Sequence, residues 1–130
     1  MSRGLLDTSV FIAREQQRPL GRLPDELAVS VVTIGELELG VLVAADANQR
    51  ARRAGTLALA RAADPIVITE AVMGAFARLA HDCRQAGVRP RILDALIAST
   101  AIEHGLPVVT QDDDFAAIAR AHPLLQVERV

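Results

Sequence analysis

Short apolar segments alternate with longer segments of helical periodicity along the whole chain. Val, Ile and Leu gather between polar or turn residues in segments that we predict as buried strands: Gly4–Leu6, Ala28–Val32, Ile66–Ile68, Pro107–Val109 and, more weakly, Leu125–Glu128. The segments between them predict helices at Ser9–Gln16, Ile34–Ala45, Asn48–Ala62, Ala71–Ala86, Leu93–His104 and Phe115–Arg120. Strands that alternate with helices indicate βαβ units and a mostly parallel sheet with helices on both faces.

The helical period is clearest in Ala71–Ala86, where one stripe carries Val72, Phe76, Leu79 and Cys83. Glycine follows this helix and the next one, which is a typical helix stop. No Gly/Ser-rich linker, charge block or repeat divides the sequence, so we predict a single domain over residues 1–130.

Composition excludes several classes of site. All 14 basic residues are Arg, so the chain has no lysine for Schiff-base, P-loop or aspartyl-phosphate chemistry. That absence argues against a haloacid-dehalogenase-type phosphatase or a receiver-like phosphoacceptor. The only cysteine, Cys83, excludes a disulfide within the chain and a multi-cysteine metal site. No G-x-S-x-G elbow supports a serine hydrolase.

The charge pattern also bears on location. The longest uncharged stretch, Leu27–Gly35, is nine residues, too short to span a bilayer. Asp7 interrupts the segment where a signal peptide would be apolar, so we expect a cytoplasmic protein with no membrane association. Taken alone, the net charge of -2 argues against a nucleic-acid partner, because phosphate binding usually accompanies a basic balance.

Acidic residues follow three of the predicted strands. Asp7 follows the first and leads into Thr8 and Ser9; Thr33 and Glu36 follow the second; Thr110 and the run Asp112–Asp114 follow the fourth. Because ligands of a parallel sheet bind outside the carboxyl ends of its strands, we expect these side chains to converge. Asp94, at the start of a predicted helix, is a further candidate.

Each acid also has a purely structural interpretation. Thr33 and Glu36 have the spacing of a capping box, and Asp7 or its neighbours can cap the next helix. Asp94 suits the first turn of a helix, where it favours the helix dipole, and Asp112–Asp114 suits a solvated loop that caps the last helix.

Two of the carboxylates lie on faces that ought to pack inward. Asp94 shares a helical face with Ile97, Ala98 and Ala101, and Glu36 shares one with Leu39 and Val43. Burying an unpaired carboxylate costs several kcal/mol, and we expect no Arg close to either stripe. A divalent cation resolves this conflict. Oxygen ligands without Cys or His favour Mg²⁺, with Mn²⁺ as a substitute, and the neighbouring hydroxyls of Thr8, Ser9, Thr33 and Thr110 would orient the carboxylates.

Together these motifs resemble those of the PIN-domain ribonucleases. The four motifs are Asp7-Thr8-Ser9, Thr33-x-x-Glu36-Leu37, Asp94-Ala-Leu-Ile-Ala and Thr110-x-Asp112-x-Asp114-Phe115. Their order and the chain length are similar to the VapC toxins of VapBC toxin–antitoxin pairs, over essentially the whole chain. The resemblance implies a PIN-like three-layer α/β/α sandwich with a mostly parallel sheet of four to five strands.

The resemblance also implies function. It predicts an Mg²⁺- or Mn²⁺-dependent endoribonuclease that hydrolyses RNA phosphodiester bonds, with Asp7, Glu36, Asp94 and Asp112 as catalytic and metal-binding acids and Asp114 as an accessory ligand. The triple Asp112–Asp114 leaves the division of work between Asp113 and Asp114 open. The expected partners are a cognate VapB-type antitoxin, RNA and a second copy in a homodimer. The helices within residues 34–62 offer an apolar groove for the antitoxin.

Recognition of RNA is expected to depend on arginine. Arg89 and Arg91 precede Asp94 and are the candidate RNA contacts, since a guanidinium binds two phosphate oxygens at once. If four of the 16 acidic residues bind metal, 12 acidic residues remain against 14 Arg. The rest of the chain then has a positive charge balance and can contact phosphate. The chain lacks Trp and Tyr and its three Phe are expected in the core, which disfavours base stacking. The alternative function is a catalytically weak PIN-like module that binds RNA or protein.

Overall fold

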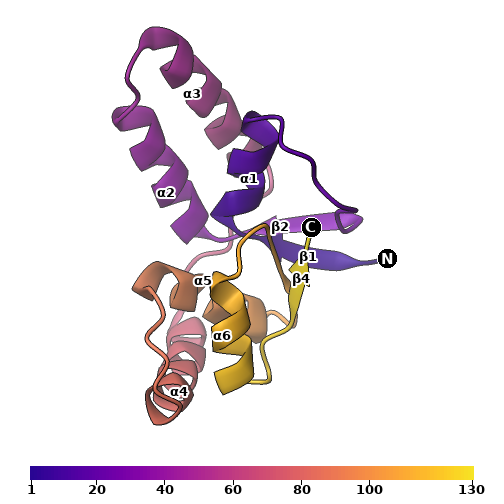
Figure 1. Ribbon diagram of the computed structural model, residues 1–130, viewed down its shortest axis with the longest axis vertical. Helices are drawn as coiled ribbons and strands as arrows, with labels where there is room; N and C mark the ends of the chain where they lie inside the picture. The colour runs from indigo at the N-terminus through magenta and orange to yellow at the C-terminus, as the bar shows by residue number, and fades with distance from the viewer.

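One parallel sheet contains four short strands in the order β2 (Glu26–Val29), β1 (Arg3–Leu6), β3 (Val108–Thr110) and β4 (Val127–Arg129). The computed structural model describes residues 1–130 (Figure 1). Its elements are β1 (Arg3–Leu6), α1 (Thr8–Glu15), β2 (Glu26–Val29), α2 (Val31–Leu42), α3 (Ala47–Arg61), α4 (Glu70–Gln85), α5 (Ile92–Glu103), β3 (Val108–Thr110), α6 (Asp114–Ala121) and β4 (Val127–Arg129).

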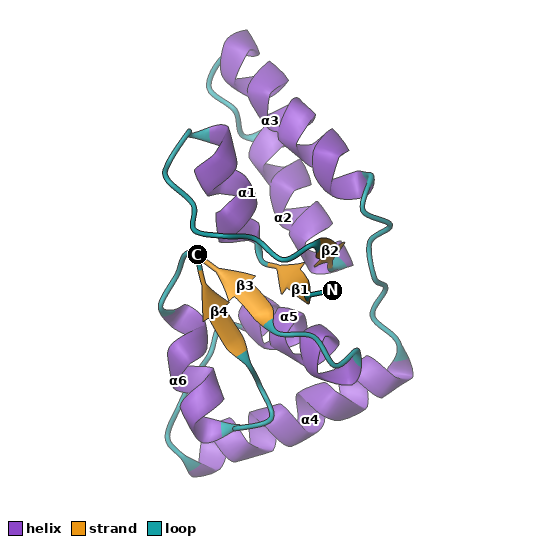
Figure 2. Ribbon diagram, turned by 90° about the vertical axis from the view of Figure 1, so that its right-hand side faces the viewer, coloured by secondary structure: helices purple, strands orange, loops and turns teal.

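Two helical layers enclose the sheet, because successive strand side chains point to opposite faces. Leu5 and Val108 pack with α4, α5 and α6, whereas Leu6 and Val109 pack with α1, α2 and α3. Figure 2 shows the strands between these two groups of helices. The predicted three-layer α/β/α sandwich is therefore confirmed, with four strands.

Two strand predictions need correction. The segment Ala28–Val32 is not one strand, because β2 ends at Val29 and α2 begins at Val31. Ser30 ends the strand there, since its side chain accepts a hydrogen bond from the backbone N–H of Val32 and caps the helix. The predicted strand Ile66–Ile68 is reduced to an isolated parallel bridge between Ser30 and Ile66.

The predicted helix stops are correct. Gly87 follows α4 and Gly105 follows α5, both in the left-handed backbone region that glycine adopts without strain, at φ values of 70° and 65°. No helix of the structure is long and apolar enough to cross a membrane.

Candidate metal centre

The carboxyl ends of β1 and β3 meet at the topological switch point of the sheet. From β1 the chain reaches β2 on one side, and β3 pairs with β1 on the other. Such a crevice is the usual ligand site of an open parallel sheet. Asp7 directly follows β1, and Asp112 lies two residues beyond β3.

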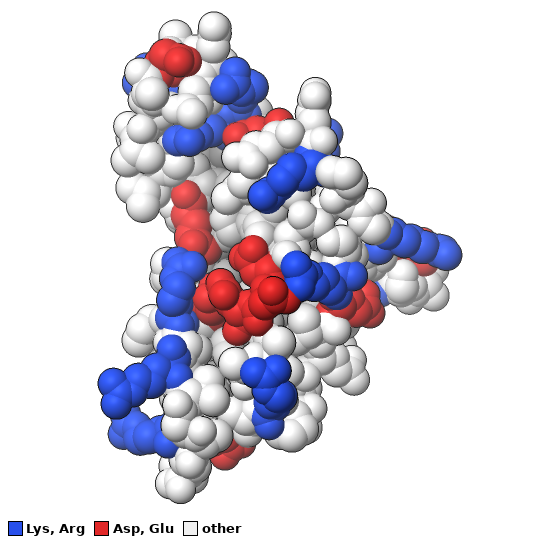
Figure 3. Space-filling view, in the orientation of Figure 1, with Lys and Arg blue, Asp and Glu red and all other residues white.

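Each helical layer adds one acid to this crevice. Glu36 comes from the second turn of α2 and Asp94 from the first turn of α5. Together with Asp7 and Asp112 they line a cleft of about 200 Å³. Figure 3 shows acidic side chains gathered at the middle of one face of the molecule, with arginines around them. The structure thus brings together the four acids that the sequence singled out.

Asp7 is the most deeply placed of these acids, with only 4% of its surface exposed. The Ser9 hydroxyl donates a hydrogen bond of 2.6 Å to its Oδ1, and the Thr110 hydroxyl donates one of 2.9 Å to its Oδ2. Burial raises the pKa of Asp7 to about 6, although both hydroxyls favour the charged form. Asp7 forms no salt bridge, so its charge has no direct cationic partner in the chain.

Glu36 is held from two sides. The Thr8 hydroxyl lies 2.7 Å from Glu36 Oε1 and 3.2 Å from the hydroxyl of buried Thr33. The guanidinium of Arg91 lies 3.6 Å from the second carboxylate oxygen of Glu36 and 3.9 Å from Asp94 Oδ1. All four predicted hydroxyls therefore lie in hydrogen bonds within or next to the acidic cluster.

The expectation that no arginine lies near these two acids is wrong. Arg91 is the N-cap residue of α5, and its side chain reaches along the first turn to the carboxylate of Asp94, three residues later. Asp94 is 8% exposed, and burial raises its pKa despite the attraction of Arg91. One exposed arginine thus bridges two acids from opposite layers without cancelling the cost of burying Asp94.

The three consecutive aspartates separate in space. The backbone N–H of Asp112 donates to the Thr110 hydroxyl at 2.9 Å, which orients this residue toward the cleft. Asp113 pairs with Arg129 and is highly exposed. Asp114 begins α6, and its charge contributes more to the raised pKa of Asp94 than Glu36 or Asp112 does. Asp114, not Asp113, is therefore electrostatically coupled to the cluster.

The helix-capping interpretation fails for the acids it was meant to explain. Asp7 and Asp113 occupy N-cap positions, but neither side chain makes a capping hydrogen bond. The proposed capping box is wrong because Ser30 caps α2, which places Thr33 and Glu36 inside the helix. Asp94 keeps its structural role as a first-turn acid of α5, and Asp114 is a first-turn acid of α6.

The chemistry of the donor set fits a divalent cation. Four carboxylates share the cleft with two arginines, Arg18 and Arg91, so negative charge remains in excess. No three of the acidic, histidine or cysteine side chains converge closely enough to form a complete protein cage for an ion. This arrangement suits Mg²⁺, which commonly takes one or two carboxylates and completes its coordination with water and substrate phosphate.

The two arginine candidates lie in different places. Arg91 lines the acidic cleft, whereas Arg89 lines a separate, larger pocket between α4 and α5. Sequence reasoning missed Arg18, which reaches the cleft from the loop after α1. Gln17 has a left-handed backbone conformation, at φ 57°, in the turn before Arg18, but no local sequence motif predicts that Arg18 reaches the cleft.

A second, strongly apolar groove lies between α1 and α3. Its volume is about 340 Å³, and its lining includes Phe11, Leu20, Leu27 and Leu59. Beyond it, Leu42 and Val43 at the end of α2 are 74% and 65% exposed, while Leu57 is buried. The apolar surface predicted on residues 34–62 is thus present in part: Leu42 and Val43 are exposed and Leu59 lines the groove, whereas Leu57 belongs to the core.

Comparisons with known proteins give a family match and two relatives. Residues 4–121 match the family model of the PIN domain. The chain is 61% identical over 100 residues to Ribonuclease VapC8 of Mycobacterium tuberculosis, across 75% of this chain and 89% of that protein. It is 48% identical over 118 residues to Ribonuclease VapC4 of the same organism, across 89% and 91%.

A solved structure extends the likeness to three dimensions. The crystal structure of VapBC-5 from Mycobacterium tuberculosis, a member of the VapBC family of toxin-antitoxin systems, contains a chain that superposes with a TM-score of 0.89. That chain is 39% identical in sequence, and the match covers 100% of both chains.

Proposed function

The chain belongs to the PIN-domain family, among the VapC ribonucleases, and from this premise we propose that it is an endoribonuclease toxin that hydrolyses RNA phosphodiester bonds with Mg²⁺ or Mn²⁺. The catalytic unit is one PIN domain over residues 1–130, acting in the cytoplasm. The observation that carries this proposal is Asp7, a carboxylate 4% exposed at the switch point with no salt bridge. A group that is costly to bury is best explained by a cation that it binds.

Asp7, Glu36, Asp94 and Asp112 are the residues that would hold the cation, one or two of them directly and the others through water, with Asp114 in an accessory role. When bound, a divalent cation makes water a stronger nucleophile and stabilises negative charge on the reacting phosphate. Ser9 and Thr110 hold both oxygens of Asp7, and Thr8 holds Glu36, so these hydroxyls keep the carboxylates oriented.

Arg91 and Arg89 are the proposed RNA contacts. Arg91 is 63% exposed in its side chain although it contacts two acids, so it can exchange those contacts for a phosphate. A guanidinium presents two parallel donors to phosphate oxygens, which fixes the strand beside the acids.

We assign the apolar groove and the exposed end of α2 to a VapB-type antitoxin. VapBC-5 is a member of a family of toxin-antitoxin systems, and the groove between α1 and α3 offers the apolar lining that a peptide segment needs. A homodimer stays a prediction from the family resemblance.

Asp94→Asn tests the proposed activity. Wild-type protein is expected to cleave RNA only with Mg²⁺ or Mn²⁺ and to inhibit growth on expression, whereas Asp94→Asn does neither. Glu103→Gln, an exposed acid on the same helix, is the matched control and should behave as wild type. Sequencing of RNA ends after brief expression identifies the cleavage sites. Equal cleavage by Asp94→Asn would refute the site, and RNA binding without Mn²⁺ binding or cleavage would establish the catalytically weak module instead.

A further inference from the structure

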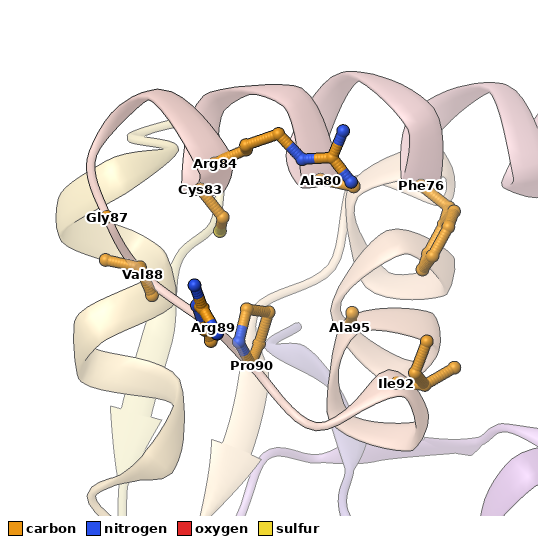
Figure 4. Close-up of a pocket in the computed structure, with 10 residues that line it drawn as sticks. All are labelled: Phe76, Ala80, Cys83, Arg84, Gly87, Val88, Arg89, Pro90, Ile92 and Ala95. Atoms are coloured by element: carbon orange, nitrogen blue, oxygen red, sulfur yellow. The ribbon is translucent and has the colours of Figure 1, made fainter.

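We propose that the pocket between α4 and α5 is a nucleotide-binding subsite for the RNA strand that enters the acidic cleft, an inference that rests on the RNA cleavage proposed above. This pocket has a volume of about 510 Å³, within the usual range of ligand sites. Figure 4 shows Arg84 on α4 and Arg89 on the connecting loop on facing sides of the space, with the ring of Phe76 toward its far end.

The pocket is a direct neighbour of the acidic cleft. The loop between α4 and α5 carries Arg89 and Pro90, which line the pocket, and then Arg91, which lines the cleft. The first turn of α5 also contributes to both sites, because Ile92 lines the pocket and Asp94 lines the cleft. A strand whose phosphate lies at the acids can therefore reach the pocket by crossing a single loop.

Charge distribution explains why an RNA strand needs this route. Phosphates are repelled by the acidic cluster, so they must be drawn in by cations beside it. Arg84, Arg89 and Arg91 lie within one short stretch of chain, and all three are exposed. Neither Arg84 nor Arg89 forms a salt bridge, so both guanidinium groups are available to phosphate.

The remaining lining suits a base. The pocket combines apolar side chains, among them Val88, Pro90 and Ile92, with the two guanidinium groups. Phe76 is the aromatic member; it is only partly buried, since it packs against the core and also lines the pocket. A base has apolar faces and is joined to phosphate, and it therefore matches an apolar wall with an aromatic ring and an arginine rim.

The test separates phosphate contacts from base contacts by their response to salt. The dissociation constant of a single-stranded RNA oligonucleotide is measured in EDTA over a range of salt concentrations. Arg84→Glu/Arg89→Glu is expected to weaken binding at least tenfold and to reduce the salt dependence by about 0.7 for each phosphate that the variant no longer neutralises. The control Arg50→Glu/Arg78→Glu changes the net charge equally at two exposed arginines outside the pocket, and it should bind within about twofold of wild type.

Phe76→Leu tests the base contact while keeping an apolar residue against the core. It is expected to weaken RNA binding about tenfold with an unchanged salt dependence, because stacking is a neutral contact. The proposal is overturned if the arginine variants keep the wild-type affinity and salt dependence. It is equally overturned if they change only the sedimentation of the protein, because the pocket would then be a contact between copies of the chain.

Cleavage by the wild-type protein in Mg²⁺ is measured in parallel. Cleavage with unaltered RNA binding by the pocket variants would refute the subsite and leave the proposed activity intact. Weakened binding by these variants, with no cleavage by wild type, would support the subsite and refute the proposed activity.

Discussion

Two aspartates in this molecule, Asp7 and Asp82, are each held by a short hydrogen bond, yet their pKa values move in opposite directions. Asp82 on α4 lies 2.6 Å from Nδ1 of the buried His122, and this hydrogen bond lowers the pKa of the carboxyl below its ordinary value. Asp7 has only hydroxyl donors at its oxygens, and burial raises its pKa to about 6. The difference lies in burial and in the partner, since only His122 can carry positive charge.

The two aspartates contribute differently to stability and to function. The Asp82–His122 pair ties α4 to the residue that ends α6, so its charge favours the folded state. Asp7 disfavours the folded state whenever it is ionised, and nothing within the chain compensates it fully. A destabilising charge of this kind is typical of a binding or catalytic site.

Replacing Asp7 should have the largest effect. Asp7→Asn is expected to lower the rate of metal-dependent RNA cleavage by at least about 100-fold, because the amide is a poor cation ligand and several kcal/mol of charge stabilisation depend on the ion. Asp82→Asn should leave the cleavage rate within about twofold at a temperature where the protein stays folded. Both rates are measured on one RNA oligonucleotide in Mg²⁺. Equal losses in the two variants would remove the distinction between the sites.

The substitutions Asp7→Asn and Asp82→Asn should have opposite effects on the free energy of unfolding. In EDTA at pH 7.5, Asp7→Asn is expected to raise the free energy of unfolding by up to about 3 kcal/mol, because burial raises the pKa of Asp7 from 3.8 to about 6. The gain should shrink as the pH falls from 6 towards 4, because wild-type Asp7 becomes protonated in the folded state first. Urea unfolding at several pH values measures this trend.

Asp82→Asn should lower the free energy of unfolding, whereas Asp7→Asn should raise it. The loss caused by Asp82→Asn should shrink as the pH falls. A depressed pKa in the folded state stabilises the protein above the ordinary aspartate value of 3.8 and loses that contribution as the pH falls through the folded pKa. A pH-independent stability difference for Asp7→Asn would show that its charge is not the destabilising feature.

The hydroxyls that hold Asp7 should matter less than the carboxylate itself. Ser9→Ala removes the 2.6 Å donor to Asp7, so we expect the pKa of Asp7 to rise further and cleavage to fall about tenfold near neutral pH. The loss should shrink at higher pH, where Asp7 is ionised again. Ser99→Ala is the matched control, because this buried hydroxyl donates only to the Ala95 carbonyl within α5. A loss that does not depend on pH would assign Ser9 a packing role.

Local patterns predicted most of this architecture and the acids of the site. Short continuous apolar segments at β1 and β3, together with the rule for parallel sheets, were enough to bring Asp7 and Asp112 to one edge. The strand at Ile66–Ile68 failed because apolar composition alone does not supply a pairing partner, and only Ile66 found one. Ala28–Val32 failed because the capping hydroxyl of Ser30 outweighed the β-branched residues after it.

Long-range geometry accounts for what sequence patterns missed. The bridge from Arg91 to Glu36 joins residues on opposite helical layers, and no spacing along the chain encodes it. Arg18 likewise reaches the cleft by way of a loop. Phe76 lies on an apolar helical stripe, and it is half-buried beside the pocket between α4 and α5, which no spacing along the chain encodes.

The smallest expected effect separates two neighbouring aspartates. Asp114→Asn should reduce cleavage several-fold, because the charge of Asp114 acts on Asp94 and we propose Asp114 as an accessory ligand. Asp113→Asn should change cleavage by less than twofold, since its carboxylate pairs with Arg129 at the surface. Surface ion pairs contribute at most about 1 kcal/mol, so neither variant is expected to unfold. Titration of cleavage with Mg²⁺ sharpens the contrast, because loss of an accessory ligand raises the metal concentration needed for half-maximal rate. If Asp113→Asn shifts that concentration and Asp114→Asn does not, the assignment of the two residues must be exchanged.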